Sequence, residues 1–161
     1  MKAQRSFDTI QPTRFEERGP LTVAGLEGTF TPEARDGIPA LWKHLAPHIG
    51  SVPGQVGAAA YGVSSMRGDK IDYTAGVEIS DGAKLPDGFT QVCLTATTYA
   101  VFSHRGHVST IPGVVGAIGN DWLPHSGWAI AEGPQVVERY GADFDPRTPS
   151  GLIEIWIPLK S

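Results

Sequence analysis

Residues 137–142, VERYGA, resemble an earlier segment of the chain, residues 58–63, AAAYGV. Three more pairs of short segments match in the same order: VAGLEGTF (23–30) with YAVFSHRG (99–106), GIPA (37–40) with TIPG (110–113), and AGVEIS (75–80) with GLIEIW (151–156). Matching segments in one order indicate an internal duplication. We therefore predict two halves, at about residues 20–80 and 90–160, within a single domain that spans residues 1–161.

Both halves show the same expected order of elements, which is strand, helix, strand, strand. Alternating apolar residues bounded by turn residues predict the strands, and apolar residues at helical spacing predict the helices. The expected strands are 13–17, 21–30, 56–65, 70–80, 90–94, 98–104, 135–141 and 152–159, and the expected helices are 32–49 and 109–122. Thr31 and Pro32 suit the start of the first helix, whereas Pro39 and Pro47 favour a shorter helix or a later start. The fold class is α+β: duplicated β-α-β-β halves form a curved antiparallel sheet, with two helices on one face and a ligand groove between the halves.

Composition narrows the classes of function. The 161 residues are 40% hydrophobic and 19% charged, with a net charge of −4, and show no basic patch of the kind that binds nucleic acid. The start of the chain lacks the apolar run of a secretory signal, and no apolar segment is long enough to span a membrane, so we expect a cytoplasmic protein. Cys93, the single cysteine, lies in an apolar run and is expected in the core. We expect no cofactor and no metal site, since His44 and His48 share helical spacing but have no evident acidic or cysteine partner.

Glu138 is the candidate centre of a binding site. In a strand, Val136, Glu138 and Tyr140 share one face, and Arg139 points to the other. The repeat aligns Glu138 with Ala59, so only one half carries the carboxylate. A carboxylate on an otherwise apolar and aromatic face is costly to bury alone, and an organic cation would compensate it. The alternative is an ordinary salt bridge to an arginine such as Arg139 or Arg105.

Aromatic side chains are the candidate walls of this site, because their faces attract organic cations. The candidates are Tyr140, Tyr61, Tyr73, Trp122, Phe102 and Trp42. Core or edge packing is the alternative explanation for each of them.

Four segments resemble a known family: YAVFSHRGHVSTI (99–111), DWLPHSGW (121–128), VVERYGADFDP (136–146) and IEIWIPLK (153–160). In this order they resemble the effector-binding domain of AraC-type and MerR-type bacterial transcription activators, also called the GyrI-like small-molecule-binding domain. The resemblance runs from about Pro20 to the C-terminus. It implies that Glu138 contacts a ligand in the groove, with Trp122 and Tyr61 at matching motif positions.

Three functions remain open after this resemblance. The first is binding of a hydrophobic, cationic or aromatic small molecule, as in multidrug-binding members. The second is hydrolysis of reactive cyclopropane-type aromatic compounds, with Glu138 as the general base and Tyr61 or Tyr140 at the leaving group. The third is a gyrase-modulating role through a protein partner. We identify no exposed apolar stripe in the sequence that favours this role. Only about twenty residues precede the first half, which is too few for a helix-turn-helix, so we expect no direct DNA binding and no membrane partner.

Overall fold

The computed structural model describes residues 10–80, 82–141, 144 and 150–160. Its strands are β1 (Arg14–Arg18), β2 (Leu21–Phe30), β3 (Gln55–Arg67), β4 (Lys70–Ile79), β5 (Thr90–Leu94), β6 (Thr97–His107), β7 (Val136–Tyr140) and β8 (Ser150–Leu159). Its α-helices are α1 (Ile38–Leu45), α2 (Ile111–Ala117) and α3 (Leu123–Ser126). Every expected strand is present, within a few residues of its predicted ends.

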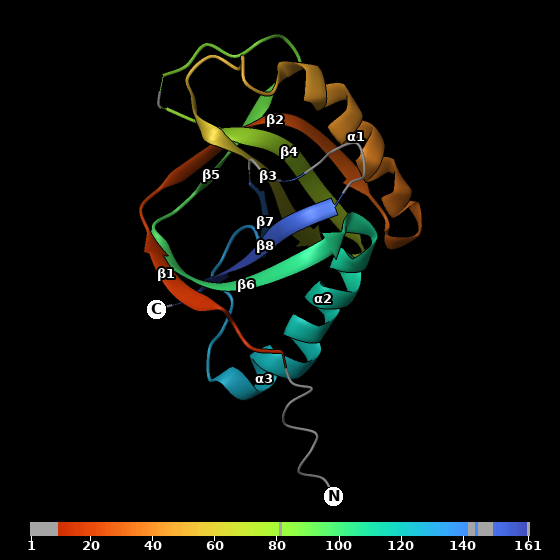
Figure 1. Cartoon of the computed structure of the whole chain (residues 1–161), viewed down its shortest axis with the longest axis vertical. Helices are drawn as coiled ribbons and strands as arrows, with labels where there is room; N and C mark the ends of the chain where they lie inside the picture. Colours follow the sequence, from red (N-terminus) through yellow and green to blue (C-terminus); the bar gives the residue numbers. More distant parts are fainter. Residues whose placement is uncertain (1–9, 81, 142–143, 145–149, 161) are drawn as a thin grey trace, which may run out of the picture.

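Within the described residues, eight strands form one antiparallel sheet in the order β1-β6-β8-β7-β3-β4-β2-β5 (Figure 1). The order contains two triplets, β6-β8-β7 and β3-β4-β2, which mirror each other across the β3–β7 pair. The predicted α+β fold class, with a curved antiparallel sheet and duplicated β-α-β-β halves, is confirmed.

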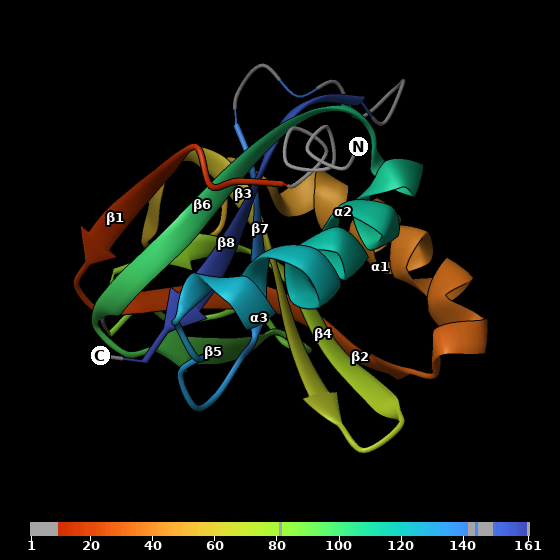
Figure 2. The ribbon, with the colours of Figure 1, turned by 90° about the horizontal axis from the view of Figure 1, so that it is seen from below.

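The helices lie together on one side of the sheet (Figure 2). The first helix starts later than Thr31 and Pro32 suggest: residues Pro32–Gly37 form a 3-10 segment, and α1 begins at Ile38. Pro39 occupies the first turn of α1, where its missing N–H costs no helical hydrogen bond. In the second half, α2 continues through a π-helical turn, Ile118–Trp122, into α3.

Two apolar layers cover the helix side of the sheet. One joins α2 to the second-half strands through residues such as Phe102, Ile111 and Ile155. The other joins α1 to the first-half strands through Leu45, Tyr73 and neighbouring side chains. The helices therefore bury the face of the sheet that carries the candidate site.

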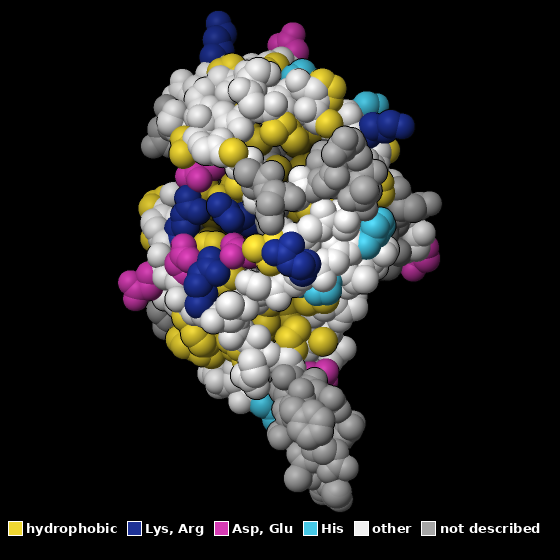
Figure 3. All heavy atoms as spheres, viewed as in Figure 1, with side chains coloured by type: hydrophobic (Ala, Val, Ile, Leu, Met, Phe, Trp, Pro, Cys, Tyr) yellow, Lys and Arg dark blue, Asp and Glu magenta, His cyan; other side chains and the backbone are white. Residues whose placement is uncertain are grey.

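The opposite face of the sheet is concave and closes around charged side chains. Arg18 on β1 forms a 2.9 Å ion pair with Glu78 on β4, although four strands lie between these two in the sheet order. Such a contact requires strong curvature, which makes the sheet a half-barrel. Figure 3 shows basic and acidic side chains gathered side by side on the face of the molecule that looks into this opening.

Glycines permit the close approach of strands that this curvature needs. Gly25 on β2 pairs with Gly76 on β4, and a Cβ at Gly25 would overlap the carbonyl oxygen of Ala75. Two side-chain-free positions facing each other let the backbones bend together without a clash.

Two further findings bear on the sequence predictions. Cys93 is exposed on β5, where the neighbouring Leu94 takes the buried position, so the expected core placement of the cysteine is wrong. In the part of the chain that the structure describes, no helix is both long enough and apolar enough to cross a membrane.

Glu154 holds the concave face together and gives a pH-dependent prediction. Its carboxylate binds Arg14 at 3.0 Å, Arg139 at 3.6 Å and the indole N–H of Trp156 at 3.1 Å. Burial raises the pKa of Glu154, but the hydrogen bonds from Arg14 and Trp156 and the charges of both arginines together lower it. A carboxyl group whose pKa is lower in the folded state stabilises the protein above its unfolded pKa, and that stability is lost as the pH falls through the folded value.

We expect Glu154→Gln to lower the free energy of unfolding by about 2 kcal/mol at pH 7, because charge-assisted hydrogen bonds are lost. The difference from wild type should be smaller at pH 3 than at pH 7, because the stability that the ionised carboxyl group contributes falls as the pH drops below its unfolded pKa. Urea unfolding at the two pH values measures both effects. Glu132→Gln, a charge-matched change at an exposed residue, is the control. An equal loss at both pH values would contradict the ionic role.

Candidate functional site

Glu138 lies in the middle of β7, at the seam between the two strand triplets. It faces Gly62 on β3 and Ile155 on β8, and only 8% of its surface is exposed. Its side chain shares the helix side of the sheet with Tyr140, while Arg139 points to the concave side and pairs with Glu154. The structure thus follows the predicted alternation, and Arg139 is not the ion-pair partner of Glu138.

Two tyrosine hydroxyls converge on one oxygen of Glu138. Tyr140 donates to Oε1 at 2.6 Å, and Tyr73 donates to the same atom at 2.9 Å. Tyr140 lies two residues along the same strand, but Tyr73 lies on β4, beyond β3. The site therefore joins residues from both halves of the sheet.

Gly62 makes the contact between Tyr73 and Glu138 possible. Tyr73 pairs with Ser64 on β3, and its side chain reaches over Gly62 to the carboxylate on β7. A Cβ at Gly62 would overlap the Tyr73 hydroxyl and lie 2.9 Å from Oε1 of Glu138. The sequence analysis missed this glycine, because nothing in the local sequence marks a glycine as a crossing point for a neighbouring strand's side chain.

Trp42 on α1 covers the two tyrosines. Its indole Nε1–H donates to the Tyr73 hydroxyl oxygen at 2.9 Å, and its ring meets the Tyr140 ring edge-on at a centroid distance of 5.2 Å. Phe144 also packs edge-on against Tyr140, with ring centroids 4.9 Å apart. The indole, the phenol and the carboxylate form a directed chain of hydrogen bonds, and each bond in such a chain polarises the next.

The two phenols remain proton donors over the ordinary pH range. Burial raises the pKa of Tyr73 and of Tyr140 well above the usual value, and the negative charge of Glu138 raises both further. The site therefore presents a buried acidic oxygen, two neutral hydroxyl donors and an aromatic cover.

The structure brings together four of the predicted site residues: Glu138, Tyr140, Tyr73 and Trp42. Phe102 shares their face but lies on β6, with Ile155 of β8 between it and Glu138.

Trp122 and Tyr61 lie elsewhere. The Trp122 ring packs on Phe102 at a centroid distance of 5.1 Å. Tyr61 is not brought to the site: it pairs with Arg139 and packs on the concave side with Val63 and Val137. The repeat alignment therefore matched Tyr61 with Tyr140, although their side chains lie on opposite faces of the sheet.

The alignment of Ala59 with Glu138 fails for the same reason, because Ala59 packs in the concave-side cluster. The residue that faces Glu138 across the seam is Gly62. Across the seam, the carboxylate therefore faces a glycine and no second carboxylate.

Metal-ligating side chains do not gather in the described part of the chain, where no group of three or more His, Cys, Asp or Glu residues could hold an ion. His44 and His48 are both exposed, and the ring of His48 packs edge-on against Phe89.

The family model for the GyrI-like small-molecule-binding domain matches residues 11–160, so the chain belongs to this family. A curated relative is the transcriptional regulator BrlR of Pseudomonas aeruginosa, which is 28% identical over 149 residues. That match covers 91% of this chain and 54% of BrlR, so the chain spans about half the length of the relative.

Solved structures share the fold at low sequence identity. The structure of SAV2435 bound to tetraphenylphosphonium has a TM-score of 0.72 at 18% identity, covering 92% of this chain and 93% of that one. The C-terminal domain of EcmrR has a TM-score of 0.64 at 12% identity, covering 92% and 96%. A hydrolase from Listeria innocua has a TM-score of 0.53 at 11% identity, covering 99% and 97%. These likenesses support the fold.

Gly62→Ala tests the crossing of Tyr73 over β3. We expect the added methyl group to displace the Tyr73 hydroxyl and to lower the free energy of unfolding by about 1–3 kcal/mol, as overpacking does. Chemical unfolding measures the loss, and near-UV circular dichroism reports the changed environment of Trp42. Gly116→Ala in α2 is the control, since its Cβ would meet open space. Wild-type stability with an unchanged spectrum would show that Tyr73 can cross β3 without a glycine at position 62.

Proposed function

We propose that the chain binds a lipophilic organic cation at Glu138, with Trp42, Tyr73 and Tyr140 as aromatic walls. The observation that carries this proposal is the buried Glu138 carboxylate, one oxygen of which is held by two tyrosine hydroxyls beneath an indole ring. Membership of a small-molecule-binding family supports a ligand at this fold.

The chemistry of the site favours a cation. Two tyrosine hydroxyls orient the carboxylate by donating to its Oε1. A desolvated carboxylate gains most from a partner of opposite charge, and aromatic faces attract the same partner. Apolar groups around the charged centre of the ligand would gain further by contact with the rings.

One solved structure with the same fold supports the same class of ligand. SAV2435, which shares the fold, was solved with tetraphenylphosphonium, a cation surrounded by four phenyl rings. BrlR is a transcriptional regulator, and EcmrR was solved in complex with DNA. The proposal for this chain is limited to ligand binding.

Trp42 controls access to the carboxylate. Its indole is bonded to Tyr73 and packed on Tyr140, so it occupies the side from which α1 covers the site. A bound ligand must exchange these contacts for its own, and we expect Trp42 fluorescence to report binding.

Binding is favoured over hydrolysis by the same geometry. A carboxylate oxygen that already accepts two hydrogen bonds is a weaker base toward water, and a general base needs free access to the proton that it removes. A hydrolase from Listeria innocua shares the fold, so the experiment below also measures turnover of a substrate.

Calorimetric titration with tetraphenylphosphonium tests the proposal. We expect Glu138→Gln to weaken binding at least tenfold, because a buried charge pair contributes more than 1.4 kcal/mol. Tyr140→Phe should weaken it less, since the ring remains. Glu132→Gln is the charge-matched control.

Unchanged affinity in a folded Glu138→Gln protein would overturn the site assignment. Failure of the wild-type protein to bind any of a panel of lipophilic cations would overturn the ligand class. Turnover of a reactive aromatic substrate, lost in Glu138→Gln while binding persists, would replace binding by hydrolysis as the function.

A further inference from the structure

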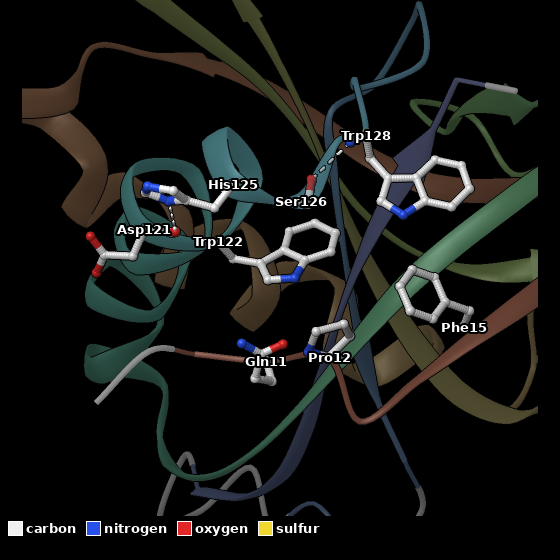
Figure 4. A pocket seen from close by; sticks show the side chains of 8 residues that line it. All are labelled: Gln11, Pro12, Phe15, Asp121, Trp122, His125, Ser126 and Trp128. Carbon is white, nitrogen blue, oxygen red and sulfur yellow. Dashed lines mark hydrogen bonds between the residues drawn. The ribbon is translucent and has the colours of Figure 1, made fainter. Parts of the chain in front are cut away.

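A cavity of about 260 Å³ opens between the start of β1 and the α3 segment, away from Glu138 (Figure 4). Its apolar walls include Phe15, Trp122 and Trp128. Trp122 packs on Phe102, and Ile155 separates Phe102 from Glu138 in the row of paired residues across the strands. The cavity and the Glu138 site therefore lie on the same side of the sheet but have different walls.

Three aromatic rings surround the cavity without filling it. The ring centroids of Phe15 and Trp122 are 6.4 Å apart and those of Phe15 and Trp128 are 5.9 Å apart, with interplanar angles of 47° and 34°. Phe15 is 50% exposed and Trp128 is 39% exposed, whereas Trp122 is almost fully buried. Two large exposed rings next to a buried one form an apolar surface of the kind that marks a binding site.

The other side of the cavity is polar and acidic. Figure 4 shows Asp121 and His125 on one side of the Trp122 indole, with Phe15 and Trp128 on the other. Among the described residues, no lysine or arginine forms an ion pair with Asp121. Nδ1 of His125 lies 3.0 Å from the carbonyl oxygen of Asp121 and must donate to it, which leaves Nε2 of the neutral ring as an acceptor.

The size of the cavity restricts the ligand. Sites for drug-sized molecules start at about 300 Å³, and this cavity, at about 260 Å³, lies just below that range. A flat system of two or three fused rings matches inclined aromatic walls, whereas a globular cation such as tetraphenylphosphonium does not. An acidic side chain and an acceptor nitrogen at one end match a positive charge that carries N–H groups.

We propose that this cavity is a second small-molecule site, which takes a flat aromatic cation bearing N–H groups. The ring system lies against Phe15, Trp128 and the uncovered edge of Trp122, and its charged end faces Asp121 and His125. This site is independent of the function proposed for Glu138.

The probe is 9-aminoacridine, a flat three-ring cation with an exocyclic amine. Acridine, which has the same rings and is mostly uncharged at pH 8, is the matched ligand. The four tryptophans allow site-resolved detection by indole N–H resonances, assigned through single Trp→Phe variants. Trp122 and Trp128 report on the cavity, Trp42 on the Glu138 site, and Trp156 on the concave face.

We expect 9-aminoacridine to shift the Trp122 and Trp128 resonances at lower concentration than it shifts that of Trp42. Acridine should bind about fivefold more weakly, and Asp121→Asn should reduce the affinity for 9-aminoacridine by the same factor, as for an exposed charge contact. Trp128→Ala and, as a second and milder variant, Phe15→Ser should each weaken binding about tenfold. Met66→Ala, another exposed apolar side chain, should have no effect.

Glu138→Gln separates the two proposals, because it should leave the response of Trp122 and Trp128 intact whether or not tetraphenylphosphonium binding is lost. The second site is overturned if 9-aminoacridine shifts only Trp42. It is also overturned if folded Asp121→Asn, Trp128→Ala and Phe15→Ser proteins bind the probe as the wild type does.

Discussion

The pairing of β3 with β7 is the constraint on which the site depends. It joins the two strand triplets of the sheet through five residue pairs, from Ala60 with Tyr140 to Ser64 with Val136. At its centre a glycine faces a glutamate, so there is room above Gly62 for a side chain from β4. Tyr73 occupies that room, and it connects the first half to the carboxylate of the second.

Glutamates on the two faces of the curved sheet have different hydrogen-bond partners. On the concave side, glutamates are matched by arginines, as in the pairs Arg18–Glu78 and Arg14–Glu154, and these contacts hold distant strands together. On the helix side, the donors to Oε1 of Glu138 are tyrosines. Because β-strand residues alternate between faces, neighbouring residues such as Glu138 and Arg139 belong to different environments.

The hydrogen-bond chain from Trp42 through Tyr73 to Glu138 ties the cover of the site to its centre. If a ligand binds at Glu138 as proposed, its contacts with Trp42 and Tyr73 would also act on α1, which carries Trp42. In a larger regulator, movement of a helix at the domain surface is a physical means of passing on the presence of a ligand.

Local patterns in the sequence determined the strands, the α+β class and the direction of the Glu138 side chain, because alternation and turn residues act over short distances. The tertiary structure decided which residues meet Glu138. A slip of one position between strands moves every side chain to the other face, so aligning the halves by similarity matched Tyr61 with Tyr140 and Ala59 with Glu138, although Tyr61 and Ala59 lie on the opposite face of the sheet. The selection of Tyr73 and Gly62 depends on the register of three strands from both halves, and that register is set by long-range packing.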